Sequence, residues 1–175
     1  MAENRPRYTL DQINKMTLLP YARTMALVFA NASWVPVLAF PHRPFRDLEH
    51  LFECMTQVLK GSDESSKLQV IEQQPDLVNP PPDDCDVQEF QLFQCDLIYH
   101  KNLAPGEKTQ MEVLQKQYHE KFGFALVFDP FQKSASEVIQ QVTSRMNHTR
   151  EEEFKEAIDA AASLAHTRLH ELLIL

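Results

Sequence analysis

Glycine is scarce in this 175-residue chain, which holds three glycines beside eleven prolines. Tight hairpins and phosphate-cradling loops need glycine, so its scarcity disfavours both and favours helices. The sequence also has no GxGxxG segment, no Walker loop, no HExxH and no GxSxG. Nucleotide cofactors and zinc-peptidase chemistry are therefore not expected, and we predict neither a cofactor nor a metal site.

The chain has no excess of basic residues. It contains 17 Lys and Arg and 25 Asp and Glu, and its net charge is −8. A fold with this charge repels nucleic-acid backbones unless it gathers its basic residues into one patch. No such patch is visible in the sequence, so nucleic-acid binding is not expected.

Membrane and redox signals are equally weak. The longest apolar region, residues 25–40, is interrupted by polar residues and Pro36 and is too short to span a bilayer. The three cysteines, Cys54, Cys85 and Cys95, form no CxxC pair, and reduced thiols are the expected state. The first residues lack an apolar signal stretch. We therefore predict a cytoplasmic protein that does not bind membranes.

What is abundant is helical patterning. Capping boxes occur at Thr9–Gln12, Ser134–Glu137 and Thr149–Glu152. Apolar residues recur at spacings of three and four after Asp47 and after Pro105, and a final helix follows Thr149. Shorter helices are expected over residues 34–40, 67–74 and 87–98, and residues 125–128 are the one strand-like stretch. We predict an all-α bundle of about eight or nine helices without a sheet, in a single domain over residues 1–175 with residues 1–8 flexible.

Several short motifs occur in a fixed order along this predicted bundle. They are Arg43-Pro44-Phe45 before the long amphipathic helix, Gln74-Pro75-Asp76-Leu77, residues 114–118 with Phe122-Gly123-Phe124, residues 145–147, and Thr167-Arg168-Leu169-His170. Over residues 15–174 this set resembles the 2-oxo-4-hydroxy-4-carboxy-5-ureidoimidazoline (OHCU) decarboxylase family. The resemblance implies an all-helical, cofactor-free lyase of urate degradation that removes carbon dioxide from the ureidoimidazoline and yields S-allantoin.

The sequence departs from the family pattern at the two catalytic positions. The motif histidine is replaced by Gln74, and alignment of the following segment puts Gln91 at the position of the family glutamate. Glutamine forms hydrogen bonds but does not transfer protons. Glu89 and His42 are therefore alternative catalytic residues, and the other histidines, His119 among them, more often occupy surfaces or helix ends. Substrate contacts implied by the resemblance are Pro75, Gln88, Gly123, Phe124, Ala125, Leu126, Val127 and Arg168.

Some of these positions have a second interpretation. Arg168 either binds an anionic ligand or pairs with a carboxylate in the core, and Phe124 is favoured as a core residue over a ligand contact. Gln74, Pro75 and Gln91 either line a pocket or belong to an ordinary helix end. Cys95 is a candidate nucleophile near the same segment, although a buried inert thiol is favoured.

Three functions stay open at this point. The chain is a decarboxylase acting on the urate-derived ureidoimidazoline or a related heterocycle, a repurposed member that catalyses another reaction in a specialised biosynthetic pathway, or a binding protein without catalysis. Each takes a small molecule as its partner. Members of the resembling family are often dimers, so a homodimer is a possibility, with a monomer that docks its own last helix as the equal alternative.

Overall fold

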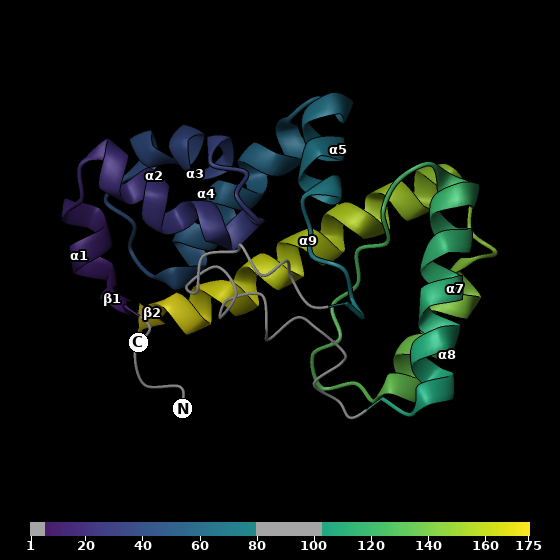
Figure 1. Ribbon diagram of the computed structural model, residues 1–175. Helices are drawn as coiled ribbons and strands as arrows, with labels where there is room; N and C mark the ends of the chain where they lie inside the picture. The colour runs from purple at the N-terminus through teal and green to yellow at the C-terminus, as the bar shows by residue number, and fades with distance from the viewer. Residues whose placement is uncertain (1–5, 80–102) are drawn as a thin grey trace. The chain divides into compact units, whose positions relative to one another are not determined.

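A computed structural model describes residues 6–79 and 103–175 and divides the chain into two compact units. Unit 1 comprises residues 1–73 and 162–175, and unit 2 comprises residues 74–161. The last helix, α9 (Arg150–Leu172), contributes residues to both units. Figure 1 traces the elements in chain order. The expectation of a single domain stays a prediction.

Unit 1 contains most of the short helices. In chain order they are α1 (Leu10–Lys15), α2 (Leu18–Ala26), the 3-10 helix η1 (Leu27–Phe29), α3 (Trp34–Ala39), the 3-10 helix η2 (Phe40–His42), α4 (Leu48–Gly61) and α5 (Glu64–Glu72). The expected stripe of α4 is largely buried, with Leu51, Met55 and Leu59 at zero exposure. These side chains, with others from α2 and α9, form the apolar core of this unit.

One turn of unit 1 belongs to the motif Arg43-Pro44-Phe45. The Arg43 Nη1 atom donates hydrogen bonds to the carbonyl oxygens of Asn14 at 3.0 Å and Met16 at 2.7 Å. The Asn14 side chain accepts from the amide of Phe45 at 2.8 Å and donates to its carbonyl at 2.9 Å. The motif therefore ties the turn before α4 to the end of α1.

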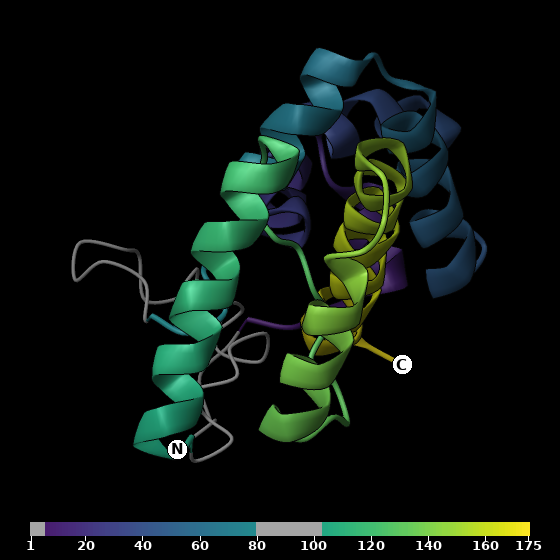
Figure 2. The same cartoon turned by 90° about the vertical axis from the view of Figure 1, so that its right-hand side faces the viewer.

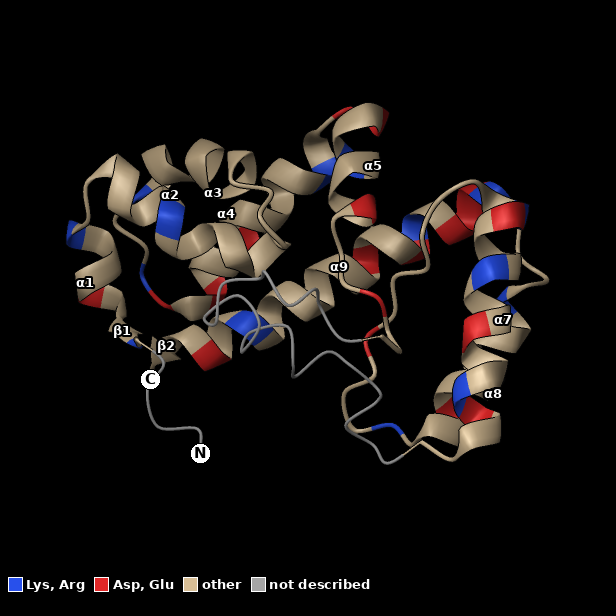
Figure 3. Cartoon of the chain, viewed as in Figure 1, with Lys and Arg blue, Asp and Glu red and all other residues tan. Residues whose placement is uncertain are grey.

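Unit 2 is built on α7 (Pro105–Phe122) and α8 (Ala135–Arg145), together with the first part of α9. Its core gathers Met111, Tyr118 and Phe122 of α7 with Val138 and Val142 of α8. Figure 2 presents α7 and α8 from a second direction, and Figure 3 shows Lys and Arg alternating with Asp and Glu along α7.

The predicted all-α class is confirmed, with eight α-helices over the described residues. The three capping boxes form as expected, at Thr9–Gln12, Ser134–Glu137 and Thr149–Glu152. Across this part of the chain, no helix is both long and apolar enough to cross a bilayer.

Four local expectations are corrected or lie out of reach. The helix expected over residues 67–74 runs over Glu64–Glu72, because the Asp63 carboxylate caps it by accepting from the Ser66 amide at 2.7 Å. Residues 125–128 form no strand. The expectation of no sheet is also wrong, because β1 (Tyr8–Thr9) pairs in parallel with β2 (Leu173–Ile174), a long-range pair without a local signal. The helix expected over residues 87–98 lies outside the described residues.

Candidate functional site

The segment Gln74-Pro75-Asp76-Leu77 forms a turn that is held by hydrogen bonds to α7. The Asp76 carboxylate accepts from the amides of Val78 at 2.8 Å and Asn79 at 2.9 Å, as in an Asx turn. Gln115 of α7 accepts from the Leu77 amide at 3.2 Å and donates to Asp76 at 3.3 Å. The motif is therefore positioned by its own acid and by one glutamine of the long helix.

A cavity of about 370 Å³ opens beside this turn, within unit 2. This size lies in the range of small-molecule sites. Seven of its ten lining residues are polar or charged, and these come from the turn and from α7, while the segment after α7 adds two apolar residues. The lining residues are Gln74, Pro75, Asp76, Asn79, Glu112, Gln115, Lys116, His119, Ala125 and Leu126.

Four predicted site residues therefore meet at one place. Gln74 and Pro75 come from the motif turn, while Ala125 and Leu126 follow the end of α7. The pocket interpretation of Gln74 and Pro75 is the one that this geometry supports.

Helix α7 adds polar residues that the sequence analysis did not place in the site. Glu112, Lys116 and His119 line the cavity from this helix. Their spacing of four and three is the helical repeat, so they share one face. The sequence carries this polar stripe as a local signal, beside the apolar positions that mark the buried face of the same helix.

The stripe brings a titratable base to the cavity. A histidine exchanges protons near neutral pH, which glutamine at position 74 does not do. His119 is exposed to solvent. The charged groups on this wall are Lys116 beside His119 and the carboxylates of Asp76 and Glu112, of which Asp76 already accepts hydrogen bonds from the turn.

The segment after α7 divides into cavity and core residues. Gly123 ends the helix in the left-handed region, at φ 78°, and its amide donates to the His119 carbonyl at 2.9 Å. Phe124 is fully buried, with its ring 6.0 Å from that of Tyr118 and 5.7 Å from that of Phe154. Val127 is also buried, and its carbonyl accepts from Arg145 at 3.4 Å. Phe124 thus has the surroundings of a core residue.

Arg168 belongs to unit 1, where it is fully buried on α9. Its Nη1 atom donates to the carbonyl oxygen of Val28 at 3.0 Å. Its role in substrate binding stays a prediction. His42 is exposed at the end of η2, in the same unit. The predicted residues Gln88, Glu89 and Gln91, with Cys85 and Cys95, lie outside the described residues.

A buried ionic cluster lies in the interior of unit 2. Glu153 accepts from Tyr118 at 2.5 Å and from Arg145, and it contacts His148 Nδ1 at 2.8 Å. Burial works to raise the pKa of Glu153, but the hydrogen bonds from Arg145, Tyr118 and His148 and the Arg145 charge outweigh it and lower this pKa. Burial, followed by the hydrogen bond to Glu153, raises the pKa of Tyr118. Both groups therefore hold one protonation state at neutral pH, as structural groups do.

Comparison with known proteins gives a consistent family match. A family model described as OHCU decarboxylase matches residues 14–170. A uric acid degradation bifunctional protein of Bacillus sp. strain TB-90 is 25% identical over 163 residues, which cover 93% of this chain and 32% of that protein. A 2-oxo-4-hydroxy-4-carboxy-5-ureidoimidazoline decarboxylase of Halalkalicoccus jeotgali is 23% identical over 168 residues, covering 96% of this chain and 93% of the relative.

A solved structure extends the match to the fold. The crystal structure of (S)-allantoin synthase superposes with a TM-score of 0.76 at 17% identity, over 95% of this chain and 54% of that one. The chain spans about a third of the length of the Bacillus sp. relative and of a second bifunctional relative, PucL of Bacillus subtilis, and over half of the solved chain.

Proposed function

This chain belongs to the OHCU decarboxylase family, and on that premise we propose that it is a carbon–carbon lyase that decarboxylates a urate-derived ureidoimidazoline or a closely related heterocycle. The observation that carries the proposal is the joint lining of one cavity by Gln74 and Pro75 of the family motif and by Ala125 and Leu126 after α7. Two separated motifs of the family pattern thus border the same small space.

The proposed decarboxylation requires two contributions from the site. When the bond to the carboxylate breaks, the electron pair passes into the ring, and a proton must then be added to the carbon that lost carbon dioxide. Groups that bind the developing charge lower the barrier, and a positioned acid supplies the proton. The side chain amide of Gln74 offers hydrogen bonds to the ring, and the imidazole of His119 offers the proton.

The charged residues on the cavity wall affect substrate binding. The substrate carries a carboxylate, which the ammonium of Lys116 attracts and the carboxylate of Glu112 repels. Asp76 opposes it less, because its carboxylate already accepts hydrogen bonds from two backbone amides. We assign Lys116 to substrate orientation and His119 to proton transfer.

A repurposed enzyme is the second candidate, and a specific observation favours it. Three amide side chains, Gln74, Asn79 and Gln115, line the cavity. Amides bind polar heterocycles through paired hydrogen bonds without titrating, so such a wall suits a ligand whose chemistry needs orientation more than proton transfer.

One assay separates the two candidates. The purified chain is mixed with ureidoimidazoline generated freshly from urate, and carbon dioxide release and the circular dichroism of S-allantoin are followed together. The first candidate predicts faster carbon dioxide release and an excess of the S product. Saturable binding of allantoin without acceleration rules out the first candidate and leaves a repurposed enzyme or a binding protein without catalysis, and the absence of both acceleration and binding overturns the proposal.

A further inference from the structure

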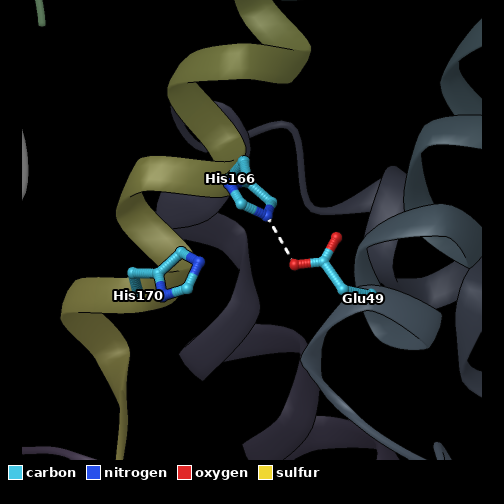
Figure 4. Close-up of side chains that lie close together, drawn as sticks. All are labelled: Glu49, His166 and His170. Carbon is cyan, nitrogen blue, oxygen red and sulfur yellow. Dashed lines mark hydrogen bonds and ion pairs between the residues drawn. The ribbon is translucent and has the colours of Figure 1, made fainter. Parts of the chain in front are cut away.

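Three side chains that commonly bind metal ions converge in unit 1, and none of them lines the cavity of unit 2. Glu49 stands in the first turn of α4, and His166 and His170 stand on α9. His166 Nε2 lies 2.8 Å from Glu49 Oε1, and one ligand atom from each residue falls within 4.8 Å of the other two. Figure 4 shows the side chains turning toward one another from the two helices.

The local sequence explains this convergence. Histidines four residues apart share one face of a helix, the arrangement by which paired histidines bind zinc. Asp47 caps α4 by accepting from the His50 amide at 2.7 Å, which fixes the turn that presents Glu49. The ring of His166 packs edge-on against Phe52, with centroids 4.8 Å apart, and against His170 at 4.7 Å. Two of the three ligands are therefore oriented before any ion arrives.

We propose that Glu49, His166 and His170 bind a divalent transition-metal ion, with Zn²⁺ as the best fit. Imidazole nitrogens with one carboxylate suit Zn²⁺, Co²⁺, Ni²⁺ or Cu²⁺ rather than Mg²⁺ or Ca²⁺, which prefer oxygen ligands. In a tetrahedral zinc site with bonds of about 2.0–2.1 Å, neighbouring ligand atoms lie about 3.3 Å apart. The His166–Glu49 separation of 2.8 Å is shorter than this value, and all three ligand atoms lie within 4.8 Å of one another, so modest side-chain rotations complete the site.

The surroundings favour a cation on balance. His170 lies in the last turn of α9, where the helix dipole is negative, and Glu49 adds a full negative charge. Arg7 opposes it, because its guanidinium donates to the carbonyl oxygens of His170 and Leu173. Arg168 lies two residues from each histidine, which is about 160–200° around the helix. It therefore lies on the opposite side of α9 from His166 and His170. The site is therefore separate from this predicted substrate contact.

Two consequences follow from the exposure of the ligands. Glu49 and His170 are exposed to solvent, so a bound ion keeps at least one position for water. The ion also links the start of α4 to the end of α9 within unit 1. Because metal binds the folded chain in preference to the unfolded one, it raises the melting temperature by an amount that grows with the logarithm of the free metal concentration above the dissociation constant.

Zinc binding is tested on the full chain without an affinity tag, after treatment with a chelator. Titration calorimetry with ZnCl₂ is expected to give one site with micromolar affinity. Thermal unfolding is expected to shift upward by roughly 5–10 °C at zinc about 100-fold above the dissociation constant. Addition of EDTA should reverse the shift, and Co²⁺ should give the visible absorption of a tetrahedral site.

Matched variants assign the binding to these residues. His170→Ala and Glu49→Gln alter exposed positions and should keep the fold while weakening zinc binding by more than about tenfold each, because a lost ligand costs at least as much as a lost outer hydrogen-bond partner. Glu53→Gln, one turn later on α4, and His119→Ala, in unit 2, should bind zinc like the parent chain. The proposal is overturned if saturable binding is weaker than about 100 µM, or if the first pair binds as tightly as the second.

Discussion

Arg145 and Glu153 form an ion pair in the interior of unit 2, with Nη2 of the arginine 2.7 Å from Oε2 of the glutamate. The Arg145 Nε atom donates to both carboxylate oxygens, at 3.1 and 3.0 Å. Glu153 is fully buried, and Arg145 is 9% exposed. Arg145 opens one of the motifs that carry the family resemblance, so this motif position contributes to the interior of the fold.

Breaking this pair should destabilise the chain strongly. Arg145→Met leaves a buried carboxylate without its cation, which typically costs about 3–5 kcal/mol. Adding Glu153→Gln removes the unpaired charge and should recover part of the loss. Urea unfolding measures the free energies. Arg23→Met, at an exposed position of α2, is the control and should change stability by no more than about 0.5 kcal/mol. Equal losses in Arg145→Met and Arg23→Met would contradict the buried pair.

The same glutamate should make the chain sensitive to acid. The pKa of Glu153 is lowered in the folded state, so its stabilisation is complete above the unfolded value of about 4.3 and is lost as the pH falls through the folded pKa. The free energy of unfolding should therefore decline below about pH 4 more steeply for the parent chain than for Glu153→Gln. Parallel pH profiles of the two proteins would show that this carboxyl is not the titrating group.

Replacing the cavity histidine should slow the proposed reaction without unfolding the chain. His119→Asn keeps a polar side chain but removes proton transfer, which is worth about 10²- to 10⁴-fold in rate. The loss should appear in kcat more than in KM. Gln117→Ala changes an exposed residue about 200° around α7 from His119 and should keep the parent rate. A comparable loss in His42→Asn, with His119→Asn active, would move the proton-transfer role to His42.

Restoring the family residues should raise the rate of ureidoimidazoline decarboxylation. Gln74→His returns a titrating group to the cavity wall, and Gln91→Glu returns the family carboxylate at its aligned position. The double variant is expected to gain about 10²- to 10⁴-fold, and more than the product of the single gains. Arg168→Lys in that background tests the predicted substrate contact and should raise KM. A folded double variant that binds allantoin without gaining rate would mean either that the aligned positions of residues 85–97 are wrong or that the pocket is shaped for another substrate.

Local sequence was sufficient for the all-α class and for several helix ends. Capping at Thr9, Ser134 and Thr149, and termination of α7 at Gly123, depend on neighbours within four residues, so the sequence predicts them. The order of motifs was likewise sufficient for the family. The same motifs predict Gln74, Pro75 and Leu126 as site residues, and all three line one cavity.

Contacts between residues distant in sequence were decided by tertiary structure alone. No local pattern encodes the packing on which these contacts depend. Examples are the pairing of Tyr8 with Leu173, the buried pair of Arg145 with Glu153, and the approach of Glu49 to His166. His119 illustrates the same limit. By sequence it is one of seven histidines, and only the docking of the Gln74–Leu77 turn on α7 makes it part of the cavity, because side-chain hydrogen bonds across that interface set where the two segments meet.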